Sequence, residues 1–151
     1  MKNIFLTICM FLLSVSLCYG AAGTSTAVTV NYPNGDSIVT VTWVGSTDDG
    51  TVPDANITGM NGKWLCSITT NPSASTPTDN YSVYLKYDGA DVLGGACATN
   101  RDTANTEITF PIVDANTTQR ACIPVYGTLV FSIANNSDTS SGGTVEFLFK
   151  K

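Results

Sequence analysis

The residues able to do chemistry in this sequence are few, and histidine is not among them. The chain has twelve Asp and Glu residues, five cysteines and no His. Without His, neither a Ser–His nor a Cys–His nucleophilic pair can form, and the commonest general base is missing. A zinc site needs four Cys or His ligands, and the cysteines include no Cys-x-x-Cys pair. We therefore expect a protein that is not an enzyme and holds no cofactor.

The carboxylates favour turns over catalysis. Glu107 and Glu146 alternate with apolar residues on expected strands, which predicts that both face solvent and do not form a glycosidase pair. The aspartates fall in expected turns, where Asp caps local backbone groups. Calcium remains an alternative, because it takes six to eight oxygen ligands and sandwich loops can supply them. The aspartates that share a loop or turn are Asp48, Asp49 and Asp54, and then Asp88 and Asp91.

The aromatic residues predict a core before they predict a binding platform. Four of them fall on the apolar phase of their strands: Trp43, Trp64, Tyr81 and Tyr87. Tyr84 shares the opposite phase with Ser82 and Lys86, so we expect it to be exposed. One exposed Tyr makes no sugar platform, although a carbohydrate-binding module stays an alternative. We take Tyr84, Asp48 and Asp49 as candidate partner-facing residues.

The first twenty residues are typical of a signal peptide. Lys2 supplies a positive start, and residues 4–17 form an apolar stretch of the length of an h-region. We predict cleavage after Gly20, with Ala22 as the second choice, which leaves residues 21–151 as a single domain. The alternative is an uncleaved membrane anchor, but the apolar stretch is shorter than the roughly 20 residues of a spanning helix. The prediction is a secreted protein, extracellular or periplasmic, with no membrane contact after cleavage.

Charge argues against nucleic acid as a partner. The net charge is −5, and an acidic surface gives no stripe of cations to neutralise phosphates. The basic residues after the leader are scattered along the chain: Lys63, Lys86, Arg101, Arg120, Lys150 and Lys151.

Three cysteines remain after the predicted cleavage, and two of them could form one disulfide in an oxidising compartment. Cys97 and Cys122 both lie in expected loops, on either side of a strand over residues 106–113. Cys66 falls on the inward phase of its own strand. We therefore favour a Cys97–Cys122 bond and a buried thiol at Cys66.

Short alternating segments separated by turn residues predict an all-β fold. Repeated runs of this kind indicate an antiparallel β-sandwich, immunoglobulin-like or jelly-roll-like, of about eight strands. The expected strands cover residues 27–32, 37–44, 56–60, 63–70, 80–87, 91–93, 106–113, 127–134 and 144–151.

Turn chemistry predicts how several of these strands pair. The sequence Pro33-Asn34-Gly35-Asp36 indicates a hairpin, and Asn61-Gly62 indicates a second, because Asn-Gly tolerates positive φ at both turn positions. On strand 27–32 Val28, Val30 and Tyr32 share one face. On strand 106–113 we expect Ile108, Phe110 and Ile112 to point inward. The terminal strand 144–151 is expected at a sheet edge, where its two lysines would limit uncontrolled pairing.

Several short segments resemble small uncharacterised proteins encoded among the structural genes of tailed bacteriophages and prophages. They are Gly62-Lys63-Trp64, Thr70-Asn71-Pro72, Pro77-Thr78-Asp79-Asn80-Tyr81, Asp91-Val92-Leu93-Gly94-Gly95, Asn100-Arg101-Asp102 and Gly143-Thr144-Val145. The resemblance implies a virion-associated β domain, decorative or fibre-like, and it implies no catalytic or binding residue.

The predicted export signal and the cysteines favour a competing interpretation, a secreted bacterial surface or pilin-like fibre subunit. Such subunits assemble by strand addition from a neighbour. In either case we expect the protein to work by association, with a protein partner or with copies of itself.

Overall fold

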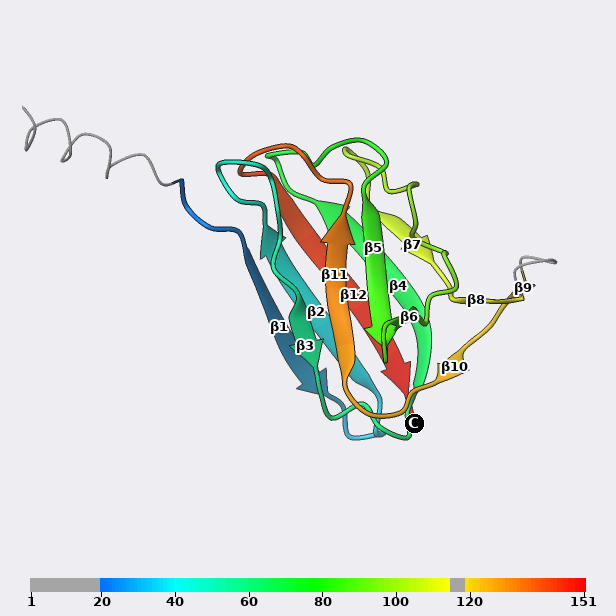
Figure 1. Ribbon diagram of the computed structural model, residues 1–151. Helices are drawn as coiled ribbons and strands as arrows, with labels where there is room; N and C mark the ends of the chain where they lie inside the picture. Colours follow the sequence, from blue (N-terminus) through cyan, green and yellow to red (C-terminus); the bar gives the residue numbers. More distant parts are fainter. Residues whose placement is uncertain (1–19, 115–118) are drawn as a thin grey trace, which may run out of the picture.

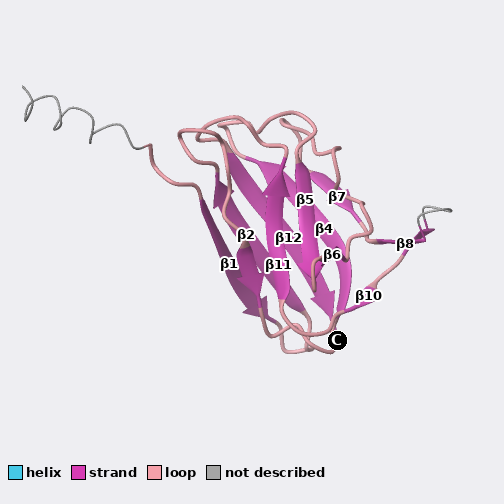
Figure 2. Cartoon of the chain, in the orientation of Figure 1, coloured by secondary structure: helices cyan, strands magenta, loops and turns pink. Residues whose placement is uncertain are grey.

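A computed structural model describes residues 20–114 and 119–151 of the chain. All regular structure in these two ranges is β-strand, and they contain no helix (Figure 2). The predicted all-β class is therefore confirmed. The predicted leader lies outside the described residues, except for Gly20 at its end.

Two antiparallel sheets face each other and form a sandwich (Figure 1). In the first, sheet A, the order is β1-β2-β12-β4-β10, with β7 also paired to β4. In the second, sheet B, the order is β3-β11-β5-β6. Sheet A comprises β1 (Thr24–Asn31), β2 (Ser37–Val44), β4 (Trp64–Pro72), β7 (Glu107–Thr109), β10 (Ile123–Pro124) and β12 (Gly142–Lys150). Sheet B comprises β3 (Ala55–Ile57), β5 (Ser82–Tyr87), β6 (Ala90–Asp91) and β11 (Leu129–Ala134).

The core fills the space between the sheets, as alternation of apolar and polar residues along each strand requires. Val39, Val41 and Trp43 come from sheet A, and Trp43 packs against Tyr81 with ring centroids 5.7 Å apart. Phe131 of sheet B meets Phe147 of sheet A edge to face, at 6.2 Å. Aromatic pairs with these geometries stabilise by about 1 kcal/mol beyond their buried area.

One predicted hairpin is confirmed and the other is wrong. β1 and β2 pair over eight consecutive residues around the Asn34-Gly35 turn. Asn61-Gly62 instead connects the two sheets, because β3 pairs with β11 and β4 pairs with β12. Gly62 does have positive φ, 78°, so the local turn chemistry is right although the strands it joins do not pair.

A β-bulge at Cys66 changes which side chains of β4 face the core. Leu148 of β12 pairs with Ser67, and the next residue, Phe149, pairs with Leu65, so Cys66 is the extra residue. An extra residue reverses the alternation beyond it. Leu65 and Ile68 are both buried, while Trp64, expected inward, is 47% exposed.

The predicted strand 106–113 is divided in two. β7 pairs with β4, and β8 (Ile112–Asp114) pairs with β9 (Gln119–Arg120) in a separate small ribbon. Pro111 between them has no N–H to donate to a ladder. The register with β4 sets Ile108 opposite Thr69 on the outer face, so Ile108 and Phe110 are exposed, contrary to expectation, and Ile112 packs against the core.

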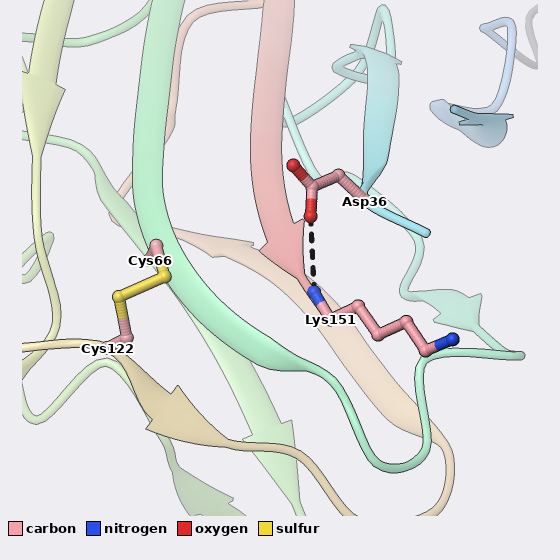
Figure 3. Close-up of a disulfide and its surroundings, with 4 residues drawn as sticks. All are labelled: Asp36, Cys66, Cys122 and Lys151. Carbon is pink, nitrogen blue, oxygen red and sulfur yellow. Dashed lines mark hydrogen bonds between the residues drawn. A yellow bond between two sulfur atoms is a disulfide. The ribbon is translucent and has the colours of Figure 1, made fainter. Parts of the chain in front are cut away.

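The disulfide joins Cys66 to Cys122, with Cα atoms 4.1 Å apart (Figure 3). Cys97 is the free cysteine of the described residues. The predicted Cys97–Cys122 pairing is therefore wrong. The bulge places Cys66 beside the segment that enters β10, where Ile123 pairs with Leu65. Alternation counted along β4 could not reveal this position, because it assumes an unbroken strand.

The strand nearest the C-terminus is central in sheet A, contrary to the edge position expected for it. β12 pairs with β2 on one side and with β4 on the other. Beyond it, the Lys151 backbone N–H donates to Asp36 Oδ1 at 3.2 Å, which ties this end to the β1–β2 turn (Figure 3). Strand addition at β12 is thereby excluded, and the candidate edges lie elsewhere.

Candidate functional site

The outer face of sheet A, which points away from sheet B, carries an apolar patch. The strand register places Val30 beside Ile38, and Ile38 beside Leu148. Val28, two residues before Val30, lies on the same face. We call these four residues, Val28, Val30, Ile38 and Leu148, the outer patch. Val28 is 58% exposed and Val30 is 51% exposed, so the apolar side chains of β1 share a face as predicted, but that face is solvent.

The same face continues across the sheet and also carries the charged residues Glu146 and Lys150. Ile108 lies at the far side on β7, 67% exposed, and Trp64 lies beside Lys150. The row Thr40, Glu146 and Thr69, which crosses β2, β12 and β4, separates Ile108 from the outer patch. Exposed apolar side chains gathered on one face are a feature of interaction sites. Neither composition nor alternation could identify this face, because alternation does not show which face of a strand meets the core.

A groove of about 460 Å³ lies at the end of this face where β12 begins. Its lining includes Gly142 and Gly143, the polar residues Thr42, Thr144 and Asn71, and the apolar residues Trp43, Val44 and Pro72. A Cβ on Gly143 would lie 2.7 Å from the Asn71 carbonyl oxygen, so no larger residue fits there. The lining residues carry no charge and more of the lining is apolar than polar, so the groove suits a neutral ligand.

Asp48 and Asp49 lie together in the β2–β3 loop, and both are exposed. Asp49 organises this loop: its carboxylate accepts hydrogen bonds from the Ser46 hydroxyl and from the backbone N–H and hydroxyl of Thr51. These bonds, that from Ser46 first, lower the pKa of Asp49 to about 2. The Asp49 carboxylate is therefore held by hydrogen bonds within its own loop, and none of these bonds involves Asp48.

Tyr84 is only partly buried, on the outer face of sheet B, and the Lys86 ammonium lies 5.3 Å from its ring centroid. Tyr87, expected in the core, is 44% exposed because β5 ends there at the Asp88-Gly89 turn. The structure thus brings Tyr84 near neither Asp48 nor the outer patch, and the three predicted partner-facing residues do not form one site.

The carboxylates cap backbone groups and gather no metal site in the described part of the chain. No group of three or more Asp, Glu, Cys or His side chains in that part could hold an ion. The Asp91 carboxylate accepts from the backbone N–H groups of Leu85, Leu93 and Gly95. The calcium alternative, which depended on Asp48, Asp49 and Asp54 or on Asp88 and Asp91, gains no support from this geometry.

Glu107 is predicted to face solvent. In the structure it pairs instead with a buried arginine. Its carboxylate lies 3.6 Å from Arg101 Nη1 and accepts from the Asp102 N–H at 2.8 Å. Arg101 is 5% exposed and also donates to the side-chain oxygen of Asn100. Glu146 is exposed, as expected. The ion pair fastens the loop after β6 to β7, and a small pocket beside it is also lined by Asp79 and Asp102.

Cys97 lies fully buried in the core, and burial raises the pKa of its thiol to about 11. Because the thiolate is the reactive species, we expect native protein at pH 8 to resist alkylation by iodoacetamide. Unfolding residues 21–151 without reductant should expose one thiol equivalent, which peptide mapping should assign to Cys97. Rapid labelling of the native protein, or recovery of the label on Cys66, would contradict both the burial and the pairing.

No family model, no curated protein and no solved structure matches the chain. Among the described residues, no helix is long and apolar enough to cross a membrane. The Cys66–Cys122 bond is compatible with an extracellular or periplasmic location, where disulfides persist.

Proposed function

We propose that this protein is a non-enzymatic structural domain, exported from the cytoplasm, that works by binding another protein. The observation that supports this function best is the outer face of sheet A, where Val28, Val30 and Ile108 are each more than half exposed. Leaving such surface in water costs about 25 cal/mol per Å², which a protein partner would recover on binding. The sequence resemblance favours a virion as the assembly to which it belongs.

The location is tested by peptide mass mapping of purified virions and of culture supernatant from the source strain. We expect peptides from residues 21–151 in the virions and none from residues 1–20. Recovery from the supernatant or cell envelope alone would favour the alternative, a secreted surface or pilin-like subunit. Recovery only from the cytoplasm, with Met1 retained, would contradict export in either form.

The binding role is tested by a charge placed on the outer face. Ile108→Lys should reduce co-sedimentation with virions at least tenfold, because a buried unpaired ammonium costs several kcal/mol at an interface. Asn56→Lys is the matched control, since Asn56 is exposed on β3 of the opposite sheet. Equal co-sedimentation of both variants and the unmodified protein would contradict a role for this face.

The groove at Gly142 and Gly143 favours a second candidate function, recognition of a neutral carbohydrate. Its lining carries no charge and combines apolar surface with hydroxyl and amide side chains. The indole N–H of Trp43, one of its lining residues, has no hydrogen-bond partner among the described residues. Titration with neutral mono- and disaccharides, followed by NMR, should shift the amide signals of Gly142 and Gly143. Shifts confined to other residues, or none, would eliminate this candidate.

A further inference from the structure

β1 is an edge strand with one open side. Among the described strands it pairs with β2 and with no other, from Thr24 opposite Val44 to Asn31 opposite Ser37. It forms the margin of sheet A in Figure 1. In an antiparallel ladder alternate residues direct their N–H and C=O groups to either side, so an eight-residue strand presents a row of such groups to solvent.

This edge lacks the devices that normally prevent pairing with another chain. Natural edges carry charged residues, Pro or a bulge. Residues 20–35 contain no charged side chain, and Thr24–Asn31 contain no Pro. The register with β2 is continuous, without a bulge. All twelve acidic residues lie elsewhere in the sequence, so β1 is a neutral strip on an acidic molecule.

The two faces of β1 differ. Ala27 packs toward the core, while Val28 and Val30 point outward from sheet A. At the beginning of the strand, the Ser25 hydroxyl donates to the Pro53 carbonyl at 2.6 Å. The segment before β3 therefore lies against the start of β1, and the second half of the strand is the more accessible.

We propose that two copies of this protein pair antiparallel along β1 and join their A sheets into one. A two-fold axis perpendicular to the sheet must pass through a residue position, since only then do opposite residues share a face. The two positions nearest the middle of the strand are Ala27 and Val28. The contact of Ser25 with Pro53 shifts the overlap toward the end of β1, which favours Val28 opposite Val28 and Thr26 opposite Val30.

Pairing in this register has a second consequence for the outer patch. Val28 of each copy lies opposite Val28 of the other, and Val30 lies opposite Thr26, all on the same face of the joined sheet. Cross-strand pairs of β-branched side chains each stabilise by about 0.2–1 kcal/mol. The dimer also removes two rows of unpaired backbone groups from an otherwise open edge. A second copy is thus a partner that both pairs the open backbone N–H and C=O groups of β1 and extends the outer patch.

The proposal rests on the proposed function only in taking the protein to act by association, and its test measures self-association of the protein alone. Protein expressed from the full-length chain should elute as a dimer in size-exclusion chromatography with light scattering when the loading concentration is raised to roughly 100 µM. Val28→Lys should reduce dimerisation at least tenfold, because it sets two ammonium groups opposite each other. An equimolar mixture of Val28→Lys and Val28→Glu should restore the dimer.

Thr42→Lys is the control, since Thr42 is exposed on the same face but lies on β2, away from the edge. It should leave the dimer intact. Loss of the dimer in both variants would mean face-to-face association and would overturn the proposal, as would a monomeric unmodified protein. Val28→Cys should give a disulfide-linked dimer under oxidising conditions, and its absence from a dimeric sample would overturn the register. If Val28→Lys is monomeric but still binds virions, self-pairing and the proposed binding function are separate properties, and the failure of one is not the failure of the other.

Discussion

Replacing Cys66 and Cys122 together by alanine is expected to lower the free energy of unfolding by about 4 kcal/mol. The bond closes a loop with a sequence separation of 56 residues, and the entropy that a cross-link removes from the unfolded chain grows with loop length. It also holds the segment entering β10, a strand of two residues, against β4. Urea denaturation of the double variant, followed by Trp fluorescence, measures the change.

Two controls separate the cross-link from the side chains. Reducing the unmodified protein should reproduce the loss seen in the double variant, whereas reductant should have no effect on the variant itself. Cys122 lies in an exposed segment, so reductant has access to the bond. A loss below about 1 kcal/mol would mean that the 66–122 loop is already restricted in the unfolded chain, contrary to the entropic argument.

Glu107→Ala is expected to cost about 3 kcal/mol, because it leaves the buried Arg101 guanidinium with no carboxylate within 4 Å among the described residues. The Arg101 side chain is 6% exposed and that of Glu107 is 30% exposed, so the arginine depends on the pair more than the glutamate does. The loss includes the hydrogen bond from the Asp102 N–H. Thermal or urea unfolding of the variant provides the measurement.

Glu107→Gln and Arg101→Met distinguish charge from hydrogen bonding. Gln can still accept from the Asp102 N–H, so the extra cost of Glu107→Ala reports that bond, worth about 1 kcal/mol. Arg101→Met keeps an apolar stem and removes the buried charge, so it should cost less than Glu107→Ala. In the double variant, Arg101→Met should offset part of the Glu107→Ala loss. The reverse order of the two single variants would contradict a charge-dominated role.

Much of the fold could be predicted from period-2 alternation, which placed β2, β5, β11 and β12 and the buried faces of Trp43, Tyr81 and Phe147. Alternation fails where a strand is irregular. The bulge at Cys66 reversed the expected orientation of Trp64 and concealed the disulfide partner. Pro111 divided a strand expected to be continuous. Pairing between distant strands leaves no local signal, so the position of β12 was unpredictable.

The candidate site escaped prediction for a related reason. An alternating apolar run indicates that one face of a strand differs from the other, but not which face meets the core. On β1 the residue packed against the core is Ala27, which is smaller than the exposed Val28 and Val30. The pairing of Arg101 with Glu107 likewise depends on a loop whose path the sequence does not specify.

The central place of β12 determines when this protein can fold. β2 and β4 both precede β12 in sequence and meet each other only through it, so sheet A cannot assemble until residues 142–150 have been synthesised. Until then β2 and β4 expose unpaired edges and apolar side chains, which favour aggregation. Contacts between segments so distant along the chain also form slowly. A chain of this topology therefore completes sheet A only after residues 142–150 have emerged, whereas every strand of sheet B is synthesised before them.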